Sequence, residues 1–140
     1  MYKKSLRVVA LIIILSTLLS CTAYAEMAAS KYIITYGGGC RWNGSRTVEV
    51  YFDITTIQYV DQLGVNYIYL YESTDLTSWT LVKTFSYSAY PNMMAYNDYS
   101  MGSYVSYYAA VSGRHYKATI VFLVVNGSDS ETRYLYTPYI

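Results

Sequence analysis

Apolar and polar side chains alternate with a period of two in several stretches of the chain. Along residues 47–55, Val, Phe and Ile occupy every second position from Val48 to Ile54, and mostly polar residues lie between them. Such an alternation places one row of side chains in a core and the other in water. It therefore predicts a half-buried β-strand.

Six further stretches carry the same signal, with tyrosine and β-branched residues as their main components. In one of them, Tyr67, Tyr69 and Tyr71 alternate with two aliphatic residues. No stretch shows the 3.6-residue periodicity of an amphipathic helix. The seven predicted strands span residues 31–36, 47–55, 65–71, 79–85, 104–110, 116–125 and 132–139.

Turn-forming residues separate these strands. Ser73-Thr74-Asp75 and Asn126-Gly127 predict tight turns, and Gly37-Gly38-Gly39 predicts a flexible connection. Residues 87–101 are expected to form a loop. Seven short strands with this spacing are typical of a two-sheet sandwich. We expect an all-β fold over residues 26–140: a single seven-stranded antiparallel β-sandwich with immunoglobulin-like wiring.

The first 25 residues have the features of a secretory signal. Lys3, Lys4 and Arg7 precede an apolar run from Val8 to Leu19, and Ala23-Tyr24-Ala25 has the small-x-small pattern of a cleavage site. The apolar run is shorter than the ~20 residues of a membrane-spanning helix. The sequence predicts a signal peptide over residues 1–25 and secretion of residues 26–140.

A lipid anchor is the alternative. Leu18-Leu19-Ser20-Cys21 is similar to the lipobox of bacterial lipoproteins, in which the cysteine becomes the lipidated first residue. Under this interpretation Cys21 tethers the protein to the membrane at the cell surface. Free secretion is the preferred prediction, because leucine is unusual before the small residue of that motif.

The composition of residues 26–140 argues against nucleic acid as a partner. The signal holds three of the ten basic residues and none of the nine acidic ones, so the formal charge changes from +1 to −2 when it is removed. A domain without a Lys/Arg cluster has little to offer phosphates. Its outstanding feature is tyrosine: the chain has 20, and only two lie in the signal.

No combination of residues predicts catalysis or a cofactor. Cys40 is the one cysteine outside the signal and His115 is the one histidine, so a nucleophile and base would have to come from this pair. We expect Cys40 to be a small buried residue instead. The sequence predicts no catalytic residues, no cofactor and a protein that is not an enzyme.

The carboxylates do not suggest a site either. Glu49 and Asp53 share a face of one predicted strand at roughly 13 Å, which is too far for a retaining glycosidase pair. Asp129 and Glu131 flank the last turn, where acidic residues are usually solvated. They are too few to fill the coordination sphere of calcium, and no metal site is predicted.

Residues 111–116, with the sequence VSGRHY, resemble the tyrosine corner of fibronectin type III domains. Val111, Gly113 and Tyr116 match that motif, although Ser112 stands where the family usually has proline. Phe52 replaces a tryptophan that is frequent on the second strand of the family. The resemblance implies that the Tyr116 hydroxyl bonds back to the backbone. We assign structural roles to Tyr116, Gly113 and Trp79.

The order of segments is also similar to that of a family of small exported proteins of Gram-positive bacteria whose function is uncharacterised. The segments that carry this resemblance are residues 68–72, 78–87, 90–94 and 113–119. The resemblance as a whole extends over most of the domain. The resemblance implies export and a single β-domain, and it implies no activity.

The tyrosines are the candidate binding residues, because tyrosine combines a flat apolar ring with a polar tip. We expect the protein to be a non-catalytic binding or surface module that presents them to a cell-surface glycan or protein. One alternative is a self-associating structural protein, and another is a bacteriocin-like secreted effector. The candidate residues are Tyr67, Tyr69, Tyr71, Tyr87 and Tyr90. The oligomeric state is left open.

Overall fold

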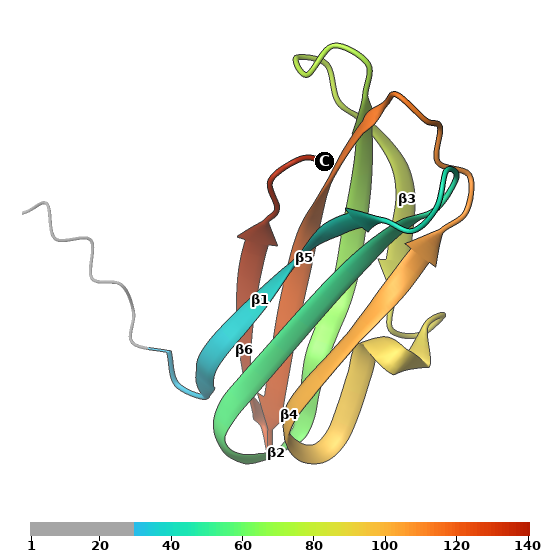
Figure 1. The fold of residues 1–140 in the computed structure, drawn as a ribbon. Helices are drawn as coiled ribbons and strands as arrows, with labels where there is room; N and C mark the ends of the chain where they lie inside the picture. Colours follow the sequence, from blue (N-terminus) through green and yellow to red (C-terminus); the bar gives the residue numbers. More distant parts are fainter. Residues whose placement is uncertain (1–29) are drawn as a thin grey trace, which may run out of the picture.

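The computed structural model describes residues 30–140, which form an all-β domain built on one antiparallel sheet (Figure 1). The predicted signal peptide and Cys21 lie outside the described residues. The strands are β1 (Ile33–Trp42), β2 (Val48–Ser73), β3 (Thr80–Ser86), β4 (Met94–Tyr107), β5 (His115–Asn126) and β6 (Asp129–Tyr136), with a short 3₁₀ helix, η1 (Pro91–Met93), before β4.

Strand β2 organises the sheet. Its first half pairs with β1 and β4, its second half pairs with β3 and β5, and β6 is added on β5; the pairing with β4 continues past the bend as far as Gly64. The strand bends sharply between the two halves, at the lower end in Figure 1. The register with β4 shifts between Thr55 and Val60. The Thr56 hydroxyl holds this bend by donating to the carbonyl oxygens of Gln58, at 2.7 Å, and Tyr99, at 3.1 Å.

The predicted count of seven strands is therefore wrong. The stretches 47–55 and 65–71 both lie in β2, because the residues between them remain extended and paired instead of forming a loop. The bend nevertheless brings the two halves of the sheet together. Tyr36 on β1 packs on Phe122 of β5 with ring centroids 5.2 Å apart, and Trp42 packs edge-on against Tyr116 at 5.4 Å.

One core lies between these two halves. It contains Val50 and Ile54 from the first half of β2, Ile68 and Leu70 from the second half, and Ile120 from β5, all fully buried. The alternation predicted for both stretches of β2 is thereby confirmed. Because β2 links all the strands into one hydrogen-bonded sheet, the structure shows an antiparallel all-β domain and does not show two separate sheets or immunoglobulin wiring.

The three consecutive glycines are part of β1 and do not form the flexible connection that we predicted. Gly37, Gly38 and Gly39 pair with Asp53, Phe52 and Tyr51 of β2. A Cβ atom on Gly38 would lie 2.5 Å from the Tyr51 carbonyl oxygen and 2.8 Å from Ile120 Cδ1. Glycine is required there because backbone and core approach too closely for any side chain.

Residues 87–101 also differ from the predicted loop. Pro91 begins helix η1. Strand β4 starts at Met94, ten residues earlier than expected, and continues to Tyr107. Met93 is fully buried and Met94 is nearly so, which ties this segment to the core. The polar residues of β4 obscured the strand in the sequence, because β4 lies at an edge of the sheet and only two of its 14 residues are buried.

The period-two alternation over residues 79–85 would place Leu81 and Phe85 on one face of β3, but a bulge separates them. The register with β2 shifts between Leu70 and Tyr71, so that Leu70 pairs with Lys83 and Tyr71 pairs with Leu81. The extra residue turns Leu81 outward, where 49% of its surface is exposed, while Phe85 remains fully buried.

The Tyr116 hydroxyl makes the backbone hydrogen bond that its motif implies. The Val111 N–H donates to this oxygen at 2.8 Å, and the hydroxyl donates to Glu72 on β2 at 2.5 Å. Burial, followed by the Glu72 carboxylate, raises the pKa of Tyr116 to about 12. Gly113 lies in the same turn with a φ of +85°, a conformation that favours glycine. The 111–116 turn is thus fastened to the sheet.

We predict opposite effects for alanine at two strand glycines. Gly38→Ala should lower the free energy of unfolding by about 1–3 kcal/mol, because the new methyl group overlaps backbone and core atoms. Gly102→Ala should raise it by about 0.5 kcal/mol, because its Cβ would have ordinary contacts of 3.6 and 3.7 Å. Urea unfolding measures both. Equal effects would contradict the close approach at Gly38.

We further predict that Tyr116→Phe lowers the free energy of unfolding by about 1–3 kcal/mol, because it leaves the Val111 N–H without its acceptor. Tyr107→Phe is the matched control: this half-buried tyrosine packs against Tyr116, and its hydroxyl bonds to no residue in the range 30–140. Its effect should stay within about 0.5 kcal/mol. A similar loss in both variants would show that the hydrogen bond is not the cause.

Candidate functional site

Five tyrosines share the outer face of the half-sheet formed by β3, β2, β5 and β6, and we call this surface the tyrosine face. Three of them lie on β2 and two on β6, and the strand register places them on the same face. Tyr67 pairs with Val121 of β5, which pairs with Tyr134 of β6, and Tyr69 pairs with Thr119, which pairs with Tyr136. The rings of Tyr67 and Tyr69 are stacked with centroids 6.1 Å apart. The five are Tyr67, Tyr69, Tyr71, Tyr134 and Tyr136.

Half of the six residues that flank the β2 tyrosines carry a hydroxyl group. The register neighbours of the β2 tyrosines on β3 and β5 are Ser86, Thr84, Leu81, Val121, Thr119 and Lys117. Lys117 is the one charged residue in this set. Most of Tyr134 and Tyr136 is exposed, at 57% and 74%, whereas Tyr69 and Tyr71 are half-buried. The tyrosine face is therefore a largely uncharged surface of rings and hydroxyls.

A shallow pocket of about 350 Å³ lies at one end of the tyrosine face. Tyr71, Trp79 and Tyr136 provide its aromatic lining, and Lys117 and Thr119 provide polar groups. The Lys117 ammonium lies 4.1 Å from the centre of the Trp79 ring. Trp79, which was assigned a structural role, also packs on Tyr139 at 6.3 Å, and this contact fixes its ring beside the pocket.

The structure brings only three of the five predicted binding residues together. Tyr67, Tyr69 and Tyr71 are on the tyrosine face, but Tyr87 and Tyr90 are half-buried and pack against the core. The Tyr90 ring contacts Phe85, which points inward, with centroids 5.0 Å apart. Tyr134, Tyr136 and Lys117 were not among the predicted binding residues. The alternation along β6 could have grouped the two tyrosines, but only the register places them beside β2.

A second aromatic group lies on the outer face of the other half of the sheet. Tyr51 and Tyr104 are paired across β2 and β4, and the Arg41 guanidinium lies over both rings, 5.4 and 6.0 Å from their centres. Arg41 also donates to the Glu49 carboxylate at 2.8 Å. The charge of the arginine is thus already balanced by a carboxylate.

Cys40 and His115 do not form a reactive pair. Cys40 is buried, and its sulfur lies 3.6 Å from the Thr137 hydroxyl. Burial raises the pKa of the Cys40 thiol to about 11, so the thiol is protonated at neutral pH. The His115 ring instead packs edge-on against Tyr139 at 5.5 Å. The prediction that Cys40 is a buried apolar residue is confirmed.

Glu49 and Asp53, the two carboxylates of β2 considered as a catalytic pair, have different roles. The Glu49 side chain is buried and accepts hydrogen bonds from Arg41 Nε at 2.8 Å and Asn43 Nδ2 at 2.5 Å. These bonds, Arg41 first, lower the pKa of Glu49. Asp53 is exposed on the surface above Gly37. Glu49 thus acts as a structural anion that joins β1 to β2.

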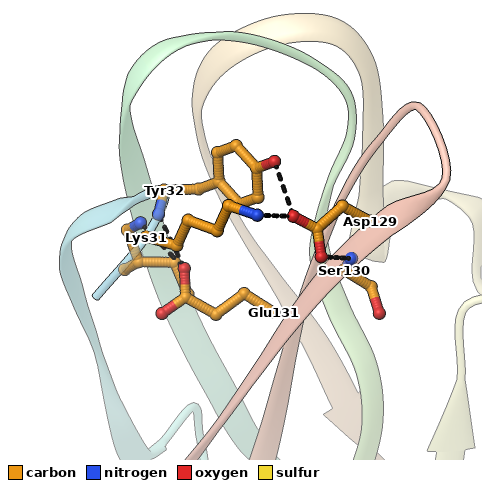
Figure 2. A network of polar contacts seen from close by, with 6 residues as sticks. Lys31, Tyr32, Asp129, Ser130 and Glu131 are labelled. Carbon is orange, nitrogen blue, oxygen red and sulfur yellow. Dashed lines mark hydrogen bonds and ion pairs between the residues drawn. The ribbon is translucent and has the colours of Figure 1, made fainter. Parts of the chain in front are cut away.

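The sequence suggested that Asp129 and Glu131 are solvated turn residues. Instead, both bind residues at the start of the described chain (Figure 2). Glu131 is buried and accepts hydrogen bonds from the Ser30 hydroxyl at 2.7 Å and the Tyr32 N–H at 2.8 Å. Asp129 is paired with Lys31 and accepts from the Tyr32 hydroxyl at 3.0 Å. We call this set the N-terminal clamp; it joins residues 30–33 to β6.

Hydrogen bonding keeps Glu131 ionised in spite of its burial. Burial by itself would raise the pKa of this carboxyl, but donors from Ser30, Tyr32, Ile33 and the guanidinium of Arg133 outweigh it. The pKa of Glu131 is consequently lowered. The clamp contains a charged carboxylate at neutral pH.

Residues 30–140 contain no group of three or more His, Cys, Asp or Glu side chains placed to hold a metal ion. They also include no helix with the length and apolar character required to span a membrane. Comparisons with protein-family models, curated proteins and solved structures found no match. The resemblances to fibronectin type III domains and to small exported proteins therefore rest on the sequence motifs alone.

We predict that Glu131→Gln destabilises the protein at neutral pH and that this effect shrinks in acid. The pKa of Glu131 is lower in the folded state than in the unfolded state, where it is about 4.3. The carboxylate therefore makes its full contribution to the free energy of unfolding above the unfolded pKa, and this contribution is lost as the pH falls through the folded pKa. The wild-type and variant unfolding curves should therefore differ most near pH 7 and converge below about pH 4.

Ser130→Ala provides the control on the same strand, because Ser130 is exposed and its side chain takes no part in the clamp. The free energy of unfolding of this variant should differ little from that of the wild type at every pH. Unfolding in urea across a series of buffers checks both variants. A Glu131→Gln effect that is constant with pH would contradict the role of the ionised carboxylate.

Proposed function

We propose that this protein is an exported, non-catalytic binding module that holds a cell-surface glycan or protein on its tyrosine face. The observation that carries the proposal is the gathering of five tyrosines from two strands on one exposed sheet surface. Tyrosine rings give large contact areas and lose little conformational entropy on binding, and their hydroxyls add hydrogen bonds. An exposed aromatic surface of this kind is typical of a binding site.

The residues around the rings favour a glycan over a protein as the ligand. Sugar rings have an apolar C–H face that can pack on an aromatic ring, and their edges are lined with hydroxyl groups. The tyrosine face offers the matching groups, with rings flanked by Thr84, Thr119 and Ser86. The pocket beside Trp79 adds a concave element of the size that small ligands occupy.

The state of the reactive groups supports a role without catalysis. The Cys40 thiol is buried and protonated, and the Glu49 and Glu131 carboxylates are occupied by structural hydrogen bonds. None of the three reaches the tyrosine face. A surface that offers rings and hydroxyls without an acid, base or nucleophile is suited to binding.

Self-association is a second candidate, and the sheet edges favour it. Strands β3 and β6 border the tyrosine face, and within residues 30–140 each pairs with one strand only. Exposed edges can pair with a further strand from another molecule. Sedimentation over a range of concentrations separates the two candidates, since a binding module that remains monomeric at high concentration does not use these edges to assemble.

We predict that Tyr136→Ala weakens retention of the purified protein on intact Gram-positive cells or on isolated cell walls by about tenfold, because it removes the most exposed ring of the tyrosine face. The measurement is the fraction of fluorescently labelled protein that pellets with the cells. Unfolding in urea should be unchanged, since an exposed substitution alters stability by about 0.5 kcal/mol or less.

Tyr108→Ala is the matched control. Tyr108 is 74% exposed, as is Tyr136, but it lies in the β4–β5 connection away from the tyrosine face. Its retention should equal that of the wild type. Equal losses in both variants would show nonspecific adhesion, and a wild type that is retained on no cell-surface fraction would refute the proposed function.

A further inference from the structure

The pocket at the end of the tyrosine face contains a positive charge that no carboxylate among residues 30–140 balances. The ion pairs of the described residues involve Lys31, Arg41, Arg114 and Arg133, and none involves Lys117. The ammonium of Lys117 instead rests on the Trp79 ring, at 4.1 Å from its centre. A cation–π contact holds the cation in place but leaves its charge available to a ligand.

The aromatic groups fix where a ligand can lie relative to this charge. Tyr71 on β2 is the register neighbour of Lys117 on β5, and Tyr136 on β6 also lines the pocket. In the pocket that the exposed Tyr136 lines, the Lys117 ammonium and the Thr119 hydroxyl are polar groups that a ligand ring packed on Tyr136 can meet. The arrangement suits a ring-shaped molecule that has an apolar face and carries one anionic group on its rim.

We propose that this pocket selects saccharides that carry a carboxylate, with Lys117 as the residue that recognises the acid group. The proposal rests on the proposed function, because it names the ligand class of the same face. A carboxylate beside Lys117 would form a charge-assisted hydrogen bond with the ammonium, in a place where ring packing on Tyr136 already holds the sugar. A neutral sugar would keep the packing and lose that bond.

The charge of the domain favours a saccharide over a nucleic acid as the anionic partner. Residues 26–140 have a formal charge of −2, and the lysine of the pocket is one isolated cation rather than part of a basic track. Nucleic acids are bound by neutralising several phosphates in succession. One ammonium among aromatic rings fits a ligand with widely spaced charges.

The test compares oligomers of galacturonic, glucuronic and N-acetylmuramic acid with their carboxyl methyl esters, which keep the rings and remove the charge. Binding to the purified protein is measured by isothermal titration. We expect at least one acid to bind about tenfold or more tightly than its ester, the factor expected for one charge-assisted hydrogen bond. Lys117→Gln should reduce the affinity for the acid to that of the ester.

Lys83→Gln is the matched control, because it makes the same change in net charge at a distance from the pocket. Its ammonium lies over Phe85 and Tyr90, on the side of the half-sheet opposite the tyrosine face. This variant should keep the preference for the acid. An equal loss in Lys83→Gln and Lys117→Gln would overturn the proposal, since it would show a general effect of charge.

The remaining outcomes separate this inference from the proposed function. If acid and ester bind equally and Tyr136→Ala weakens both, the carboxylate selectivity is wrong and the binding face stands. If no acid binds, or if a single-stranded oligonucleotide binds more tightly than every acid, the inference is likewise wrong. Retention of the wild type and of the Tyr136→Ala variant on cells then decides the proposed function independently.

Discussion

The pairing of β2 with four other strands is the constraint on which the rest of the structure depends. Each half of this strand forms the centre of a three-stranded segment, and the bend between them turns the two segments toward each other. The core forms between the segments because both halves of β2 direct their aliphatic side chains inward. Each outer face then consists of whatever residues alternate with the core, and on the second half these residues are tyrosines.

Close approach and polar ties hold the folded sheet together. Gly38 allows β1 to lie against β2 and Ile120, and no residue with a side chain would fit there. Glu131 fixes the beginning of β1 to β6, and the Tyr116 hydroxyl links the β4–β5 turn to Glu72 on β2. Within residues 30–140 every buried side-chain nitrogen or oxygen has a hydrogen-bond partner. These groups thus avoid the cost of unsatisfied burial.

The tyrosines of this protein perform two physical roles that composition alone does not separate. Tyr116 is fully buried and Tyr90 packs against Phe85, so both contribute to the interior. Tyr134 and Tyr136 are exposed and extend the surface begun by Tyr67. The same ring suits either place because its body is apolar and its tip is polar. The difference arises from position in the sheet.

Local patterns in the sequence determined the β-class, the inward faces of both halves of β2 and the turn at Asn126-Gly127, because alternation and turn chemistry act over a few neighbouring residues. The hydrogen bond of Tyr116 also followed from a short motif. Tertiary structure alone decided that one bent strand replaces two, that Gly37–Gly39 are paired, and that Lys117 and Trp79 meet beside Tyr136. These features depend on strand register and on contacts between residues far apart in the chain, which no local pattern encodes.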